Sequence, residues 1–266
     1  MIQAIGIAAA VVGGVGLLIG LLLGFAGRLF AVKVDEREVA VREALPGSNC
    51  GGCGFAGCDA LAKAIVAGEA PVNTCPVGGA AVGEKIAAIM GVEAAATERK
   101  VAYVHCTGTC DKAKLEYHYY GAVDCRQAAA APGYAGKACA FGCFGLGTCV
   151  AECPSGAIRL QDGVAVVDPD KCISCGKCTA VCPQHIIAMR PETAAVEVGC
   201  SSAAPGKAVK AVCDAGCIGC GICQKTCPAE AITVENYLAR VDHTRCTGCG
   251  ACAAKCPVKV IHLLGN

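Results

Sequence analysis

The spacing of the cysteines constrains this chain more than any other feature of its sequence. Of 266 residues, 25 are cysteine, a density at which cysteines determine the fold. Small secreted domains reach this density with disulfides, but they are much shorter than this chain. Tryptophan is absent and aromatic residues make up only 4 %, so the large side chains that fill a conventional core are scarce. We therefore expect the cysteines to organise the interior.

A repeat with an offset of 74 residues divides most of these cysteines into two sets. Each set encloses a stretch with strand-type alternation around a turn, Ala157–Asp168 in the first and Ala231–Asp242 in the second. A fixed period identifies a building block, so we expect two tandem modules of one fold. The upstream set is Cys139, Cys143, Cys149, Cys153, Cys172, Cys175, Cys178 and Cys182, and the downstream set is Cys213, Cys217, Cys223, Cys227, Cys246, Cys249, Cys252 and Cys256.

Three segments share the spacing Cys-x2-Cys-x2-Cys-x3-Cys-Pro, which is the bacterial iron–sulfur run. In such a run three thiolates hold one [4Fe-4S] cube and the fourth holds the neighbouring cube. Structural zinc is the alternative, but zinc prefers two separated Cys-x2-Cys pairs. The spacing predicts three ligand sets: Cys172, Cys175 and Cys178 with Cys153; Cys217, Cys220 and Cys223 with Cys256; and Cys246, Cys249 and Cys252 with Cys227.

The first half of the upstream set departs from this spacing. Leu146 stands where the downstream copy has Cys220. The ligands Cys143, Cys149 and Cys182 therefore lack a fourth member. The nearest cysteine is Cys139, which we expect to complete the set.

Two further groups of cysteines lie outside the runs. The first is Cys50-x2-Cys53-x4-Cys58-x16-Cys75-Pro76, which suffices for one cube, although zinc also fits this spacing. The second is Cys106, Cys110, Cys125, Cys200 and Cys213. A further cluster held by Cys106, Cys110, Cys125 and either Cys200 or Cys213 is one interpretation, and free structural thiols are the other. The sequence thus predicts at least five [4Fe-4S] clusters, and six if this set is complete, with one thiol left over.

An apolar segment opens the chain. Residues Ala4–Gly27 carry no charged or polar side chain, and as a helix they would extend about 36 Å, more than the ~30 Å hydrocarbon layer of a bilayer. The first basic residues, Arg28, Lys33 and Arg37, follow the segment. We therefore expect a single-pass anchor in the plasma membrane, in contact with lipid, with the iron–sulfur domains in the cytoplasm.

These patterns predict an α+β chain in four parts. The parts are a transmembrane anchor over 1–30, a juxtamembrane helix and helical four-Cys domain over 31–100, a Cys-rich insert with the first ferredoxin module over 101–190, and a connector with the second module over 191–266. Helices are expected over 35–46, Asp59–Ala67 and Ala80–Met90, followed by a polar linker near Glu93–Lys100.

Catalytic side chains and nucleic-acid contacts are not expected. No nucleophile with its base is recognisable, and no glycine-rich phosphate loop follows a predicted strand. The net charge of +1 provides no broad field for nucleic acid.

With these motifs in view, the chain resembles the family of B subunits of the Rnf complex, the membrane-bound ferredoxin:NAD oxidoreductase of anaerobic bacteria. The resemblance rests on the apolar N-terminus, the unit from Asn49 to Cys75-Pro76, and the C-terminal repeats. It implies an electron-transfer subunit that receives electrons from reduced ferredoxin or flavodoxin. These electrons would pass to other subunits of the membrane complex, which couple their transfer to Na+ or H+ translocation.

Two other functions are also consistent with the cysteines. One is a ferredoxin-like subunit of another membrane redox enzyme, such as a hydrogenase or a reductase. The other is a metal-binding regulatory or storage protein, which would contain no labile sulfide.

Overall fold

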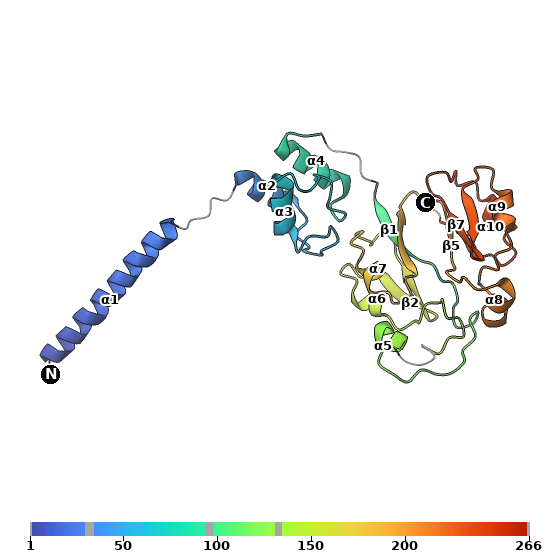
Figure 1. Ribbon diagram of the computed structural model, residues 1–266, viewed down its shortest axis with the longest axis horizontal. Helices are drawn as coiled ribbons and strands as arrows, with labels where there is room; N and C mark the ends of the chain where they lie inside the picture. The colour runs from blue at the N-terminus through green and yellow to red at the C-terminus, as the bar shows by residue number, and fades with distance from the viewer. Residues whose placement is uncertain (1, 30–34, 94–97, 131–134, 265–266) are drawn as a thin grey trace.

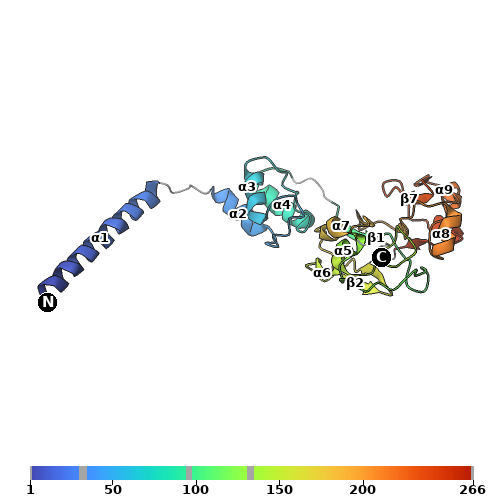
Figure 2. The ribbon, with the colours of Figure 1, turned by 60° about the horizontal axis from the view of Figure 1, so that its bottom comes forward.

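The computed structural model describes residues 2–29, 35–93, 98–130 and 135–264. Figures 1 and 2 show a long N-terminal helix, then a small helical domain, then two modules built from short strands and helices. The two modules follow one another in chain order, as the repeat predicts. Part of the predicted polar linker near Glu93–Lys100 lies outside the described residues.

The prediction of a single transmembrane helix is wrong. The apolar segment does form a helix, α1 (Ile2–Leu29). Among the residues that the structure describes, however, no helix has both the length and the apolar character needed to cross a membrane.

The helical domain consists of α2 (Glu36–Ala44), α3 (Cys58–Val66) and α4 (Gly79–Met90), close to the predicted ranges. Asp35 caps the N-terminus of α2, because its carboxylate accepts the backbone N–H of Arg37 at 2.9 Å. Apolar residues at helical spacing turn one face of each helix inward. Their contacts form a small core in which Val41, Leu61, Ile65 and Ile86 are at most 2 % exposed.

The two modules share one architecture of paired two-stranded antiparallel sheets. In the first module β1 (Lys100–Val104) pairs with β4 (Ile187–Pro191), and β2 (Ile158–Gln161) pairs with β3 (Val164–Val167). In the second module β5 (Val196–Val198) pairs with β8 (Ile261–Leu263), and β6 (Ile232–Glu235) pairs with β7 (Leu238–Val241). The predicted hairpins are thus β2–β3 and β6–β7. This agrees with the ferredoxin-type part of the predicted fold.

Short helices follow the cysteine loops. They are α5 (Cys125–Ala130), α6 (Thr148–Ala151) and α7 (Lys177–Val181) in the first module, and α8 (Gly206–Val212), α9 (Ile222–Thr226) and α10 (Ala251–Lys255) in the connector and second module. The β2–β3 hairpin closes on Asp162 and Gly163, both with positive φ, which is the two-residue turn that matches strand twist.

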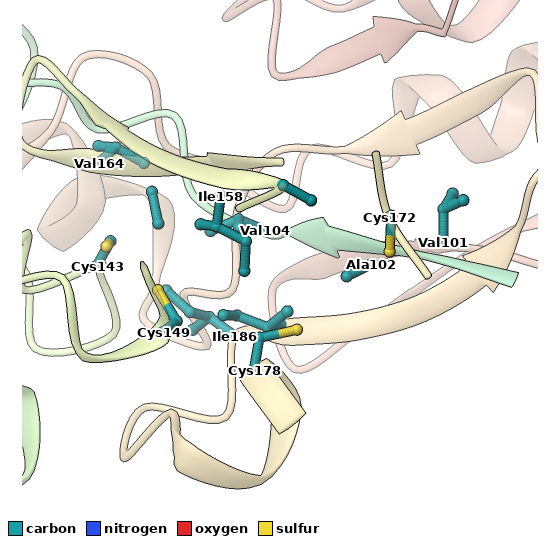
Figure 3. Packing of buried hydrophobic residues seen from close by; sticks show 13 residues of the cluster. Val101, Ala102, Val104, Cys143, Cys149, Ile158, Val164, Cys172, Cys178 and Ile186 are labelled. Atoms are coloured by element: carbon teal, nitrogen blue, oxygen red, sulfur yellow. The ribbon is translucent and has the colours of Figure 1, made fainter. Parts of the chain in front are cut away.

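Cysteines form part of the core of each module. In the first module, Cys143, Cys149, Cys172 and Cys178 are at most 9 % exposed and pack with valines and isoleucines of the sheets. Figure 3 shows these four sulfur atoms among the aliphatic side chains. The second module repeats the arrangement with Cys217, Cys223 and Cys252. The expectation that cysteines organise the interior agrees with this packing.

Candidate metal-cluster sites

All 25 cysteines are free thiols. Within the described part of the chain, no three His, Cys, Asp or Glu side chains converge closely enough to hold one metal ion. A cube of four irons and four sulfides is wider than a single ion, so its thiolates stand further apart around a pocket. Pockets lined by several cysteines are therefore the candidate cluster sites.

The first such pocket lies in the helical domain and is lined by Cys50, Cys53, Cys58 and Cys75, which we name the N-terminal group. The side chain of Asn49 accepts the backbone N–H of Cys58 at 2.8 Å and so fixes the start of α3 against the loop. Burial raises the pKa of Cys75, although backbone N–H groups of Gly78 and Val77 directed at its sulfur oppose the rise. N–H groups of this kind stabilise a thiolate, as a cluster ligand requires.

The second pocket is lined by Cys125, Cys143, Cys149 and Cys182, which we name the insert group. It contains the three expected cysteines, but the fourth is Cys125 and not the expected Cys139. Helix α5 brings Cys125 there, because its backbone N–H donates to the hydroxyl of Thr148 at 2.7 Å, next to Cys149. Burial raises the pKa of Cys149 to about 12, and the thiols of Cys143, Cys125 and Cys182 add to the rise.

The third pocket is lined by Cys106, Cys139, Cys200 and Cys213, which we name the bridging group. Its members come from the end of β1, from the loop before α6, and from both ends of the connector, so both modules contribute. Burial raises the pKa of Cys200 to about 11, and a backbone N–H of Cys217 opposes the rise. The backbone N–H of Ser202 also donates to the sulfur of Cys200, at 3.4 Å.

Two of the sequence-based assignments in this region therefore differ from the structure. A set of Cys106, Cys110 and Cys125 is not brought together, because Cys106 lies in the bridging group and Cys125 in the insert group. Cys110 lines none of these three pockets and is exposed. Its backbone N–H donates to the carbonyl of Asp162 at 2.9 Å, which holds it over the β2–β3 turn.

Three more groups follow the runs. We name them by the runs: the first-run group is Cys153, Cys172, Cys175 and Cys178, the second-run group is Cys217, Cys220, Cys223 and Cys256, and the third-run group is Cys227, Cys246, Cys249 and Cys252. Burial raises the pKa of Cys178 to about 11, with contributions from Cys172, Cys175 and Cys153.

The crossing of ligands between runs is visible in the downstream repeat. Burial raises the pKa of Cys223 to about 11; a backbone N–H of Gln224 opposes the rise, and the thiols of Cys217, Cys220 and Cys256 add to it. Burial likewise raises the pKa of Cys252, and among its thiol neighbours are Cys227 and Cys246. Cys256 thus lies near the first three cysteines of the second run, and Cys227 lies near Cys246 and Cys252 of the third.

Contacts also connect one group to the next. The backbone N–H of Cys143, in the insert group, donates to the sulfur of Cys106, in the bridging group, at 3.3 Å. The backbone N–H of Cys217, in the second-run group, is directed at Cys200 of the bridging group. Cys149 of the insert group lies near Cys178 of the first-run group. The five groups of the two modules therefore adjoin one another.

A last contact joins the helical domain to the first module. A Cβ atom placed on Gly52 would lie 2.6 Å from the carbonyl oxygen of Cys175. Only glycine permits this approach, because real Cβ atoms do not come so close to backbone. Gly52 stands between two cysteines of the N-terminal group, and Cys175 belongs to the first-run group.

One charged residue near these sites is buried, and the sequence did not indicate this. Lys137 is 8 % exposed and lines the bridging pocket. Nothing in its sequence neighbourhood predicts burial, because lysines are almost never fully buried unless paired.

Comparison with known proteins is consistent with the pockets and runs. Residues 45–77 match the family described as "Putative Fe-S cluster", and residues 138–186 and 216–260 match the 4Fe-4S dicluster domain. The chain is 47 % identical over 246 residues to the B subunit of the Na(+)-translocating ferredoxin:NAD(+) oxidoreductase complex of Acetobacterium woodii, covering 92 % of this chain and 74 % of the relative.

Two other relatives match over similar lengths. The B subunit of the ion-translocating oxidoreductase complex of Methanosarcina acetivorans is 45 % identical, over 89 % of this chain and 89 % of the relative. The B subunit of the proton-translocating ferredoxin:NAD(+) oxidoreductase complex of Clostridium ljungdahlii is 47 % identical, over 86 % of this chain and 81 % of the relative.

Proposed function

Because this chain belongs to the family of B subunits of the ion-translocating ferredoxin:NAD(+) oxidoreductase complexes, we propose that its six cysteine groups are consecutive stations of one electron relay. The chain is the iron–sulfur electron-transfer subunit of such a complex, works with other subunits, and binds multiple [4Fe-4S] clusters. Each cluster, when bound, accepts and releases one electron. Ion translocation requires a membrane, so the complex operates at one.

We assign the ligands by pocket and run. The N-terminal, insert, bridging, first-run, second-run and third-run groups each hold one cluster, and Cys110 remains a free thiol. The donor set supports this assignment, since four cysteines line each of the three pockets and thiolate is the ligand of cubane clusters. Backbone N–H groups directed at Cys75, Cys106 and Cys200 would hold the sulfurs in place.

The contacts between groups support one order for the relay. The third-run group takes Cys227 from the second run, and the second-run group takes Cys256 from the third, so these two groups are neighbours. The second-run group in turn contacts the bridging group through Cys217 and Cys200. The bridging group touches the insert group, and the insert group lies against the first-run group. The contact of Gly52 with Cys175 then leads to the N-terminal group. This unbroken series of neighbours is the observation that carries the proposal.

Reduced ferredoxin or flavodoxin is the proposed donor, and the second module is its proposed entry. The N-terminal group would then deliver electrons to the partner subunits. We place the cysteine groups in the cytoplasm, because a reducing compartment keeps free thiols such as Cys110 unpaired. Contact of the chain with membrane lipid stays a prediction.

The order is tested by Cys53→Ala in the assembled complex, with Cys110→Ala as the matched control. Reduced ferredoxin should still reduce the clusters of both modules in Cys53→Ala, while transfer to the partner subunits stops. In Cys110→Ala both should proceed as in the unmodified complex. If the clusters of the modules stay oxidised in Cys53→Ala, the N-terminal group lies at the entry and the proposed order is wrong.

A further inference from the structure

Lys137 lies against the bridging group, and no acid among the described residues pairs with its charge. Building on the proposed relay, we propose that Lys137 raises the reduction potential of the bridging cluster. This cluster is then the first of the chain to be reduced and holds the first electron.

The side chain of Lys137 is fixed by two neutral acceptors. Its Nζ donates to the carbonyl oxygen of Gly108 at 3.0 Å and to that of Gly163 at 2.8 Å. Within the described ranges, no carboxylate lies within the 4.0 Å that would define an ion pair with it. Two carbonyls satisfy hydrogen bonds but do not cancel a full positive charge. The ammonium therefore acts on its surroundings as an uncompensated cation.

The surroundings of this cation are the bridging pocket. Lys137 lines that pocket together with its four cysteines. Burial raises the pKa of Cys139, and the charge of Lys137 is among the influences that oppose the rise. The same charge acts on Cys143 of the insert group, again against a larger effect of burial. The N-terminal and insert pockets, by contrast, have no lysine, arginine, aspartate or glutamate among their described lining residues.

A buried cation favours the reduced state of a neighbouring cluster. Reduction adds one negative charge, and the attraction of that charge to Nζ is strong where water and salt do not screen it. Net charge and hydrogen bonds to sulfur both set cluster potentials. The backbone N–H groups of Cys143 and Ser202, which donate to Cys106 and Cys200, act in the same direction. The bridging group thus combines both influences.

The place of the bridging group gives this potential a function. It lies between the second-run group and the insert group, at the junction of the two modules. A station of raised potential at this point keeps one electron inside the chain between turnovers. A second electron then enters a relay that is already charged, so transfer toward the N-terminal group does not wait for two encounters with donor.

The test is an equilibrium redox titration of the purified complex under anaerobic conditions, followed by electron paramagnetic resonance. Lys137→Met removes the charge, and Lys137→Gln removes it but retains a hydrogen-bond donor in case Met disturbs folding. Lys137→Arg keeps the charge. Lys114→Met, at an exposed lysine of the preceding segment, is the matched control. Iron and sulfide contents establish that each variant binds its clusters.

The first wave to be reduced in the unmodified complex should move in Lys137→Met and Lys137→Gln. We expect its ratio of reduced to oxidised cluster to fall about tenfold at a given potential, which is about 59 mV for a one-electron couple. Lys137→Arg and Lys114→Met should leave it in place. Cys213→Ala should remove this same wave, which identifies it as the bridging cluster.

Three results would overturn the proposal. The first wave could stay in place in both neutral variants with full iron content, it could shift equally in Lys137→Arg, or Cys213→Ala could leave it intact. The titration uses chemical mediators and no ferredoxin. A failure of the relay order would therefore appear in the Cys53→Ala experiment and not here.

Discussion

Pairs of cysteine substitutions can establish which thiols share a cluster. Substituting two ligands of one cluster removes that one cluster, whereas substituting one ligand in each of two clusters removes both clusters. The losses of iron are therefore non-additive only when both substitutions lie in one group. In the structure Cys125 and Cys182 line one pocket, while Cys106 and Cys125 line different pockets. The sequence alone suggested the reverse pairing, with Cys106 and Cys125 together and Cys182 elsewhere.

The expected iron contents follow from six groups of four cysteines. Six [4Fe-4S] clusters contain about 24 irons. Cys125→Ala with Cys182→Ala should lower this to about 20, because one cluster is lost. Cys106→Ala with Cys125→Ala should lower it to about 16, because two clusters are lost. Cys110→Ala should keep about 24, since its exposed thiol lines none of the three pockets.

The assay is iron and acid-labile sulfide per chain in anaerobically purified protein. Both double variants remove two thiols, so the difference between their iron contents shows whether the two thiols belong to one group or to two. The grouping of the ligands is wrong if the two double variants exchange their values, or if Cys110→Ala loses a cluster. A sulfide content near zero in the unmodified chain would contradict iron–sulfur binding altogether.

Three further predictions concern single positions. Gly52→Val should stop electron transfer between the first-run and N-terminal groups at full iron content, because its Cβ would lie 2.6 Å from the carbonyl oxygen of Cys175. Rapid-freeze spectroscopy measures the transfer rate, with Ala56→Val at an exposed position as the control. An unchanged rate in Gly52→Val would show that electrons do not pass through this contact. Ile86→Ala, at a residue with 0 % exposure, should lower the free energy of unfolding of the helical domain by about 2–5 kcal/mol, measured by urea denaturation; a cost below about 1 kcal/mol would mean that α4 does not depend on this core. Burial, aided by the charge of Lys112, lowers the pKa of His262 from 6.5. The unfolded chain therefore binds the proton more readily, and the contribution of His262 to the free energy of unfolding falls as the pH drops below 6.5. His262→Gln should flatten the dependence of stability on pH in this range, and an identical profile would contradict the lowered pKa.

The runs could be predicted from sequence because their ligands are local. Three cysteines within seven residues must face one centre, and the crossing of the fourth follows from the repeat, as the neighbours of Cys223 illustrate. The helices of the N-terminal domain were equally accessible, since apolar spacing and a capping Asp35 are short-range signals.

The bridging and insert groups could not be predicted in the same way. Cys139 is close to Cys143 in sequence, yet the chain turns so that Cys139 faces the bridging pocket and Cys125 replaces it beside Cys149. The hydrogen bond from Cys125 to Thr148 that decides this exchange spans 23 residues, and no local pattern encodes it. The N-terminal helix illustrates the opposite error, because hydropathy alone predicted a span that the described residues do not support.

The bridging group also dictates how the protein must be assembled. Its first ligand is Cys106 and its last is Cys213, so no ribosome-bound fragment that ends before the second module can complete this centre. Clusters whose ligands are close in sequence can be loaded early, whereas this one has to wait until both halves have met. Its insertion is therefore a late step of assembly, which follows the docking of the two modules.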